Sequence, residues 1–238
     1  MTTATGSSRH AASGRAAGGA TGSAPKVRLD RDSIVAAGLE LAADTAATTI
    51  SVRDLGARLG TDPTAIYRHF RNKEALMQAL LDELNARSVA AVTAEPEEWR
   101  ERLRQLARAT LASFTTYPAI AVEATVLTTH GPGELDAVEL MLDAFSRAGL
   151  DGDELVRHYA LMASHVLSTA AGIARGRAGR VGDDDTSPWF DGPILADPRT
   201  HPRIAELGVK MALLEDRDLF MLGVEAVIQS AERAAAAR

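Results

Sequence analysis

The stretch from Thr61 to Lys73 holds a dense group of side chains that can donate hydrogen bonds. Its donors are Thr61, Thr64, Tyr67, Arg68, His69 and Lys73. Hydroxyl, imidazole, guanidinium and ammonium groups in one short stretch are suited to bind phosphate oxygens or the edges of nucleic-acid bases. Arg53 lies upstream, near the start of a predicted helix, and is suited to a phosphate or a base edge as well.

The apolar spacing around this group predicts two short helices joined by a tight turn. Ser51 opens the first helix, where its hydroxyl can accept from the Asp54 amide while the Asp54 carboxylate reaches back. Gly60 closes that helix, and Asp62 followed by Pro63 starts the second. The inward-facing apolar residues are Leu55, Leu59, Ile66 and Phe70. This pattern is typical of a helix-turn-helix, whose second helix enters the DNA major groove by its N-terminal end.

Two longer helices are predicted on either side of this unit, over residues 30–44 and from residue 72 to about 92. Gly38 lies inside the first of them, where its lack of a side chain indicates close packing. Asn72 caps the second, so that Lys73 and the free amides beside it form a helix N-terminus that favours an anion. The apolar stripe of this second helix is Leu76, Leu80 and Leu84.

Charge is unevenly distributed along the 238 residues. The whole chain has a net charge of −6, whereas residues 1–91 hold 11 basic and 9 acidic residues and are therefore at +2, which leaves the remainder at −8. The donor-rich stretch is thus a basic patch on an acidic protein, and the acidic body would help to orient the patch toward DNA. Residues 1–28 are of low complexity and are predicted to form a disordered arm.

The composition excludes several kinds of protein. The chain has no cysteine, which excludes disulfide scaffolds, thiolate metal sites and cysteine nucleophiles. No apolar stretch approaches the roughly 18 residues that a membrane span requires, and the N-terminus lacks the apolar region of a secretory signal. We therefore expect a cytoplasmic protein with no membrane partner.

The rest of the chain has helical periodicity and no strand pattern. Helices are predicted from residue 96 to the break at Pro118 and over 119–127, 134–147, 151–175, 204–214 and 218–236, with a loop over 176–202. The predicted fold is therefore all-α, with nine to ten helices. It divides into a three-helix DNA-binding unit over 29–76 and a larger ligand-binding and dimerisation domain over 77–238.

The run from Gly60 to Leu76 resembles the signature of the tetracycline-repressor (TetR) family. That family shows a Tyr, a variable residue, a His or Tyr, a Phe, a few polar residues, a Lys, and then Glu and Leu. The matching run here is Tyr67-Arg68-His69-Phe70-Arg71-Asn72-Lys73-Glu74-Ala75-Leu76. The resemblance covers about residues 31–84, and the rest of the chain matches only in the number and length of its helices. It implies a homodimeric transcriptional regulator, most often a repressor that a small apolar or amphipathic effector releases from operator DNA.

By this resemblance, the side chains that hold phosphates are Tyr67, His69 and Lys73. Those that meet bases are Pro63, Thr64, Ala65 and Arg68, with Arg53 at a phosphate or base contact and Thr61 on the same outward side. Pro63 and Ala65 offer only apolar contact, for instance with a thymine methyl group. Sequence specificity is therefore expected to rest on Thr64, Arg68 and Arg53.

The resemblance also implies that the C-terminal domain dimerises. The residues whose spacing suits a four-helix interface with a second subunit are Leu155, Tyr159, Val166, Ala170, Ile173, Leu219, Leu222 and Ala226. The same stripes can fill the core of one subunit, which is the usual role of about half of such residues.

Effector binding, likewise implied, would use large apolar or soft side chains on the central helices and the 176–202 loop. The candidates are Trp99, Phe114, Leu127, Met141, Phe145, Met162, His165, Trp189 and Phe190. Each of them is also of a type that commonly fills a core. His158 and His165 would lie about 10 Å apart along one helix, too far to share a metal ion. Neither a metal nor another cofactor is expected.

Operator binding would require two recognition helices about 34–36 Å apart, and the helix over 72–92 is the expected lever between the two domains. Two alternatives are a helical ligand-binding or scaffold protein without DNA binding and an enzyme that modifies small molecules. The sequence has no Ser/His/Asp order, phosphate-binding loop, HExxH or dinucleotide fingerprint, so we expect no catalysis. A scaffold would have no use for the phosphate-suited set of Arg53, Tyr67, His69 and Lys73.

Overall fold

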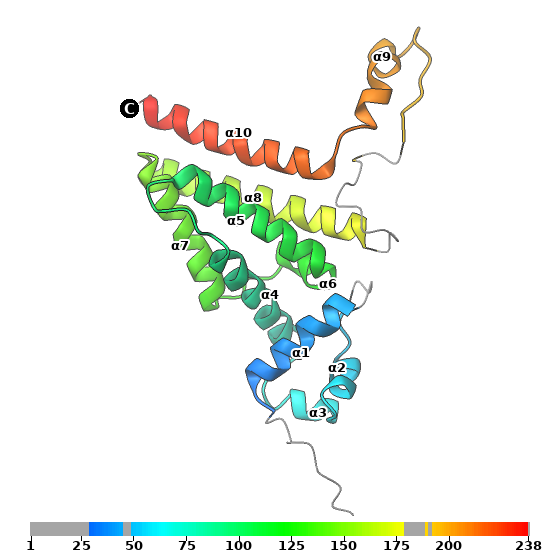
Figure 1. Ribbon diagram of the computed structural model, residues 1–238, viewed down its shortest axis with the longest axis vertical. Coiled ribbons are helices and arrows are strands. Elements are labelled where there is room, and N and C mark those ends of the chain that lie inside the picture. The colour runs from blue at the N-terminus through cyan, green and yellow to red at the C-terminus, as the bar shows by residue number, and fades with distance from the viewer. Residues whose placement is uncertain (1–28, 45–48, 179–188, 190–191, 238) are drawn as a thin grey trace, which may run out of the picture.

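The computed structural model describes residues 29–44, 49–178, 189 and 192–237. These residues form ten α-helices and one 3₁₀ helix (Figure 1). The helices are α1 (Arg31–Asp44), α2 (Val52–Arg58), α3 (Pro63–Ile66), α4 (Lys73–Ala90), α5 (Trp99–Thr116), α6 (Pro118–Ala121), η1 (Val122–Thr125), α7 (Pro132–Arg147), α8 (Gly152–Arg177), α9 (Pro202–Met211) and α10 (Asp216–Ala236). The described ranges contain no β-strand, and the all-α prediction is confirmed. No helix within them combines the length and the apolar character that a membrane span requires.

Helix α2 packs against both α1 and α3. The N-terminal unit contributes Ile34, Leu55, Ile66 and Phe70, all fully buried, to the hydrophobic core that it shares with the larger bundle. Gly38 of α1 faces Leu80 of α4 so closely that a Cβ atom on Gly38 would lie 2.8 Å from Leu80 Cδ2. The close packing expected at Gly38 is therefore confirmed, and it joins the N-terminal unit to α4.

Side-chain caps start three of the N-terminal helices. Ser51 Oγ accepts from the Asp54 amide at 3.3 Å, and Asp62 Oδ1 accepts from the Thr64 amide at 2.8 Å. Asn72 Oδ1 accepts, also at 2.8 Å, from the amide three residues later. These bonds satisfy amides that have no partner inside their own helices, which is why short segments such as α2 and α3 begin where they do.

Helix α4 connects the two parts of the molecule (Figure 1). It packs against α1 on one side and against α5 and α7 in the larger bundle. Its 18 residues form one uninterrupted helix, about 27 Å long at 1.5 Å per residue. The helix therefore contacts both the N-terminal unit and the larger bundle.

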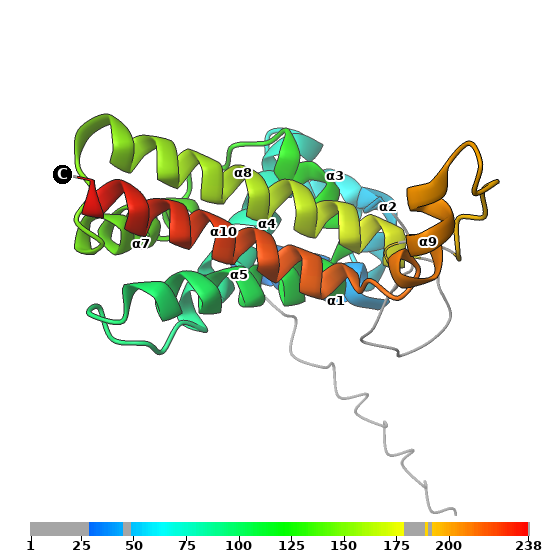
Figure 2. The same ribbon diagram turned by 90° about the horizontal axis from the view of Figure 1, so that it is seen from above.

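Helices α8 and α10 run side by side (Figure 2), and two histidines of α8 bond to α10. His158 Nε2 lies 3.2 Å from Ser230 Oγ, and His165 Nε2 lies 2.9 Å from the carbonyl oxygen of Phe220. The His165 ring also stacks on the Phe220 ring at 5.5 Å between centroids. At Gly223, a Cβ atom would come within 2.2 Å of the His165 ring, so any larger residue at this position of α10 would require that ring to move.

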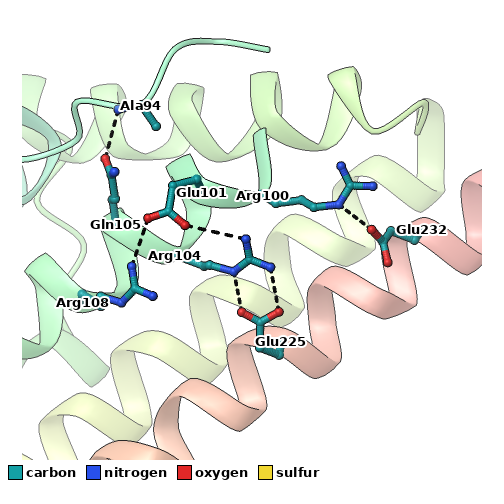
Figure 3. A network of polar contacts seen from close by, with 8 residues as sticks. All are labelled: Ala94, Arg100, Glu101, Arg104, Gln105, Arg108, Glu225 and Glu232. Carbon is teal, nitrogen blue, oxygen red and sulfur yellow. Dashed lines mark hydrogen bonds and ion pairs between the residues drawn. The ribbon is translucent and has the colours of Figure 1, made fainter. Parts of the chain in front are cut away.

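Ion pairs between α5 and α10 hold these helices together (Figure 3). Arg104 binds Glu225 through two hydrogen bonds of 2.5 and 2.9 Å, and Arg100 binds Glu232 at 2.5 Å. The bond to Arg104 lowers the pKa of the Glu225 carboxyl, and the bond to Glu225 raises the pKa of Arg104. Both carboxylates therefore fix α10 to α5 while they are ionised.

The predicted helices are found with shifted ends. Helix α5 begins at Trp99 rather than at residue 96. The single helix predicted over 119–127 is instead the short α6 followed by the tighter η1, which ends at Thr125. Helices α9 and α10 each begin two residues earlier than predicted. The arm predicted over residues 1–28 lies outside the described residues.

Candidate DNA-binding surface and ligand cavity

The second helix of the helix-turn-helix is only one turn long. Helix α3 starts at Pro63, after the Asp62 cap, and ends at Ile66. Hydrogen bonding from Thr64 lowers the pKa of the Asp62 carboxyl, which keeps the cap ionised. Beyond Ile66 the chain continues in turns, in which the amides of His69 and Phe70 bond to the Ile66 carbonyl at 3.0 and 3.1 Å. Tyr67, Arg68 and His69 therefore follow the helix and are not part of it, which differs from the sequence prediction.

The nine residues predicted to contact DNA all remain accessible to solvent. The exposed ones are Arg53, Thr64, Tyr67, Arg68 and Lys73, and the half-buried ones are Thr61, Pro63, Ala65 and His69. The large apolar side chains between them, Ile66 and Phe70, are buried at 0% and 1% exposure. The tyrosine and the phenylalanine of the same segment thus have different roles: Phe70 is core, and Tyr67, at 45% exposure, is surface.

The basic side chains of the N-terminal unit differ in whether they already bind another group of the protein. Within the described part of the chain, Arg53, Arg68 and Lys73 form no ion pair. Arg58, by contrast, binds Glu40 of α1 at 3.1 Å, and Arg31 donates to the His69 carbonyl and lies 4.4 Å above the Phe70 ring. The last two fasten α1 to the helix-turn-helix, and the first three are available to an anion.

A cavity lies inside the larger bundle, with about 740 Å³ of empty space including its mouth. It is enclosed by α4, α5, α7 and α8 and by the segment from η1 to Thr129. Its apolar lining is Leu81, Leu103, Leu106, Ala107, Ala124, Leu127, Ala137, Val138, Met141, Met162, Ala163, Val166 and Leu167, and its polar lining is Asn85, Ser88, Thr110, Thr129, Glu134 and Tyr159. A mostly apolar cavity with a few polar groups is the usual form of a small-molecule site.

The polar residues of the cavity lining differ in how many hydrogen bonds they already form within the protein. The hydroxyls of Ser88 and Thr110 donate to carbonyls of their own helices, each at 2.9 Å. Glu134 Oε2 accepts from the amides of Thr129 and His130 at 2.7 and 2.6 Å and lies 2.9 Å from Thr129 Oγ1. Burial, together with the negative charge of Glu134, raises the pKa of Tyr159. Glu134 is therefore the residue that places a charge in the described lining of the cavity.

The wall that carries Glu134 is bound directly to α4. Asp82 of α4 accepts from the amides of Gly133 and Glu134 at 3.2 and 2.9 Å, and from the Thr129 hydroxyl at 2.8 Å. A Cβ atom on Gly133 would lie 2.2 Å from the Asp82 carbonyl oxygen, and one on Gly131 would meet the Asp82 carboxylate at 2.3 Å. We call this contact between Asp82 and residues 129–134 the α4–α7 clasp. It joins the cavity wall to the helix that carries the DNA-binding unit.

The candidate ligand residues lie in several places. Leu127, Met141 and Met162 line the cavity. Trp99, Phe114 and Phe145 are buried in the core outside its lining, and His165 faces α10. Trp189 is half exposed, with its backbone amide bonded to the Leu214 carbonyl at 2.7 Å, and Phe190 lies outside the described residues.

Sequence reasoning missed the small and polar lining residues, above all Asn85, Thr129 and Glu134. Tyr159 was assigned to the dimer interface, yet it lines the cavity. The described residues contain no cluster of side chains with the composition of a metal site.

The residues predicted to dimerise divide into three groups by their exposure. Val166, Ala170 and Ile173 are buried within one subunit, and Leu155, Tyr159 and Leu219 are partly covered. Leu222 is 65% exposed, and Ala226 is exposed beside it on α10. On α8, Val156 and Leu161 are apolar and exposed as well, at 58% and 51%. On α8 and α10, the exposed apolar side chains are therefore at different residues from most of those predicted.

A helix-turn-helix with unpaired cations, joined by one helix to a bundle that encloses a cavity, defines a DNA-binding protein that can respond to a ligand. Two family models match the chain: residues 34–80 match "Bacterial regulatory proteins, tetR family", and residues 93–232 match "Tetracyclin repressor-like, C-terminal domain". The chain therefore belongs to the TetR family, and it is a DNA-binding transcriptional regulator.

Individual relatives agree with this assignment. The tetracycline repressor protein class D of Escherichia coli is 28% identical over 212 residues, covering 86% of this chain and 90% of that protein. The transcriptional repressor DrrR1 of Streptomyces coeruleorubidus is 28% identical over 146 residues, which span 61% of this chain and just over half (54%) of that repressor.

Solved structures share the fold. A transcriptional regulator from Streptomyces coelicolor superposes with a TM-score of 0.72 at 28% identity, covering 87% of this chain and 99% of that one. The TetR family protein ActR of Streptomyces coelicolor, in complex with actinorhodin, has a TM-score of 0.72 at 21% identity, covering 88% of this chain and 99% of that one.

Proposed function

We propose that this protein is a homodimeric repressor that leaves its operator when a small amphipathic molecule fills the cavity of the larger bundle. The observation that carries this proposal is the α4–α7 clasp, because Asp82 bonds to the same segment whose Thr129 and Glu134 line the cavity. The assignment as a repressor is supported by the relatives, which include tetracycline repressors and DrrR1. The ActR complex with actinorhodin supports a ligand in a bundle of the same fold.

DNA would be bound by the exposed surface of the helix-turn-helix. Tyr67, His69 and Lys73 are assigned to phosphates, where their donors match anionic oxygens. The residues assigned to bases are Pro63, Thr64, Ala65 and Arg68, with Thr61 beside them and Arg53 at a phosphate or a base edge. Because α3 has a single turn, its N-terminal end is the part that would enter the major groove. We assign residues 29–76 to this DNA-binding unit and 77–238 to the effector-binding and dimerisation domain.

A dimer would form through α8 and α10, where apolar side chains such as Val156, Leu161 and Leu222 are exposed. Two helices from each subunit make a four-helix interface, which sets the spacing of the two DNA-binding units. Operator binding requires that spacing to be about 34–36 Å, one turn of DNA. A ligand that favours another position of α4 would therefore lower the operator affinity.

The cavity would act through binding and not through catalysis. A ligand that donates to Glu134 would bind the same carboxylate that the amides of Thr129 and His130 hold in place, and would pull on that segment. Movement of that segment changes the bonds that Asp82 receives, and so the position of α4. Because operator DNA is the other partner, we place the protein in the cytoplasm.

The test begins with selection of an operator from random DNA by the purified full-length protein. Affinity for that operator is then measured by fluorescence anisotropy at several salt concentrations for wild type, Lys73→Ala and Arg68→Ala. Lys73→Ala should weaken binding to all sequences alike and reduce the salt slope by about one, whereas Arg68→Ala should cost about 1–3 kcal/mol and relax the preference at one position.

The matched control is Arg58→Ala, since Arg58 is already paired with Glu40 and is expected to have little effect on DNA binding. Selection that yields no preferred sequence, together with wild-type affinity in both variants, would refute the proposed DNA-binding role.

A further inference from the structure

The described lining of the cavity carries a negative charge and no positive charge. Glu134 is the one charged side chain among its described lining residues, and no lysine, arginine or histidine lines it. Glu134 Oε2 is occupied by the donors of Thr129 and His130, whereas Oε1 receives no hydrogen bond from the described chain. One carboxylate oxygen of the lining is therefore accessible and free to accept from a ligand.

A second carboxylate intensifies this negative character. Thr129 Oγ1 lies 2.8 Å from Asp82 Oδ1 and 2.9 Å from Glu134 Oε2. A hydroxyl carries a single hydrogen and can donate it to only one of the two. Neither Asp82 nor Glu134 forms an ion pair within the described chain. Two carboxylates that have no cationic partner among the described residues thus lie close to Thr129 at one end of the cavity, and an added cationic donor would be attracted to that end.

We propose that the cavity selects a cationic amphiphile: an amine whose apolar body packs on Leu103, Met141 and Met162 and whose N–H groups donate to Glu134. The role of this molecule as effector rests on the function proposed above, but its binding to the cavity does not depend on DNA. Glu134 is then the residue that sets ligand specificity.

The remaining polar groups fit this ligand. Asn85 and Tyr159 line the cavity and form no side-chain hydrogen bond to the described residues. The Asn85 carbonyl oxygen and the Tyr159 hydroxyl oxygen can both accept from an ammonium group. An anionic ligand would instead place its charge against Glu134 without a lysine or arginine to compensate, which is unfavourable in an apolar surrounding.

The test compares three probes that share one body and differ in charge: anthracenylmethylamine, anthracenemethanol and anthracenecarboxylate. Their affinities for the full-length protein are measured by anthracene fluorescence and calorimetry without DNA. The amine should bind wild type roughly tenfold more tightly than the alcohol, as a hydrogen bond to a charged group predicts, and the carboxylate should bind least.

Glu134→Gln keeps an oxygen that can accept from Thr129 and His130 but removes the charge. In this variant the amine should lose its tenfold advantage, and the carboxylate should bind more tightly than it does to wild type. Glu139→Gln is the matched control, because Glu139 is exposed on the same helix outside the cavity, and it should leave all three affinities unchanged.

Three results would overturn the proposal. They are wild-type binding of the carboxylate as tight as that of the amine, no binding of the amine by wild type, and an undiminished preference for the amine in Glu134→Gln. The first two need no variant, so the proposal is testable even if the substitution impairs folding. Operator affinity measured without any probe separates a failure of this inference from a failure of the proposed DNA binding.

Discussion

The cations of the two domains differ in what they bind. In the helix-turn-helix, Arg53, Arg68 and Lys73 are exposed and form no ion pair with the described residues. In the larger bundle, arginines are paired between helices: Arg102 with Asp143, Arg104 with Glu225, and Arg177 with Asp216.

Arginine thus serves packing in the larger bundle, whereas in the N-terminal unit it is divided between packing, as at Arg58, and an exposed surface, as at Arg53 and Arg68. The difference lies in the partner: a carboxylate supplied by the chain satisfies the bundle arginines, whereas DNA phosphates would satisfy those of the N-terminal unit. The net charge of −6 does not reveal this difference between the arginines of the two domains. Loss of a paired arginine or its carboxylate should therefore change stability, and loss of an unpaired one should change DNA binding.

The largest effect on stability is expected when the ion pair between Arg177 of α8 and Asp216 of α10 is broken. Asp216 is 5% exposed and accepts from Arg177 at 3.0 and 2.5 Å. Asp216→Ala should lower the free energy of unfolding by about 3 kcal/mol. The Arg177 guanidinium would stay largely buried but would lose this carboxylate as a partner. Urea unfolding at a fixed protein concentration measures the loss.

Asp218→Ala is the control, since Asp218 is an exposed acid in the same first turn of α10. An equal loss of stability in both variants would show that the helix terminus, and not the pair, is responsible.

A smaller effect, which depends on pH, is expected at Glu225. The pair with Arg104 is partly exposed, so Glu225→Gln should cost about 0.5–1 kcal/mol near neutral pH. The bond to Arg104 lowers the pKa of Glu225 in the folded protein. Its contribution is therefore complete above the unfolded pKa of about 4.3 and is lost as the pH falls through the folded value. Unfolding curves of wild type and Glu225→Gln should converge in acid, and a gap that persists or widens there would contradict this assignment.

The DNA-binding surface could be predicted from the sequence because its residues lie close together in the chain. Caps at Ser51, Asp62 and Asn72 and buried side chains at Ile66 and Phe70 fix the local structure. Within this segment only the length of α3 was overestimated, since Tyr67 already leaves the helix.

The cavity could not be predicted in the same way, because separate helices contribute its lining. Large apolar residues such as Phe114 and Phe145 fill the core completely, and space is left where Ala107, Ala137 and Ala163 face inward. The size of a side chain alone therefore does not locate the cavity, since Met141 and Met162 line it and Phe114 and Phe145 do not. The α4–α7 clasp could not be predicted from the sequence either. Asp82 and Gly133 lie far apart in the sequence, and their contact depends on the packing of α4 against α7.

Operator affinity with and without the amine probe tests the coupling between the cavity and DNA most directly. Fluorescence anisotropy on the selected operator compares wild type with Asp82→Asn, in which an NH₂ group would replace one acceptor of the clasp. We predict that saturating anthracenylmethylamine weakens operator binding by wild type by about 5- to 150-fold, and that Asp82→Asn, also saturated with the amine, releases the operator far less. If wild type binds the amine with unchanged operator affinity, or if Asp82→Asn responds in full, the clasp does not connect the two sites.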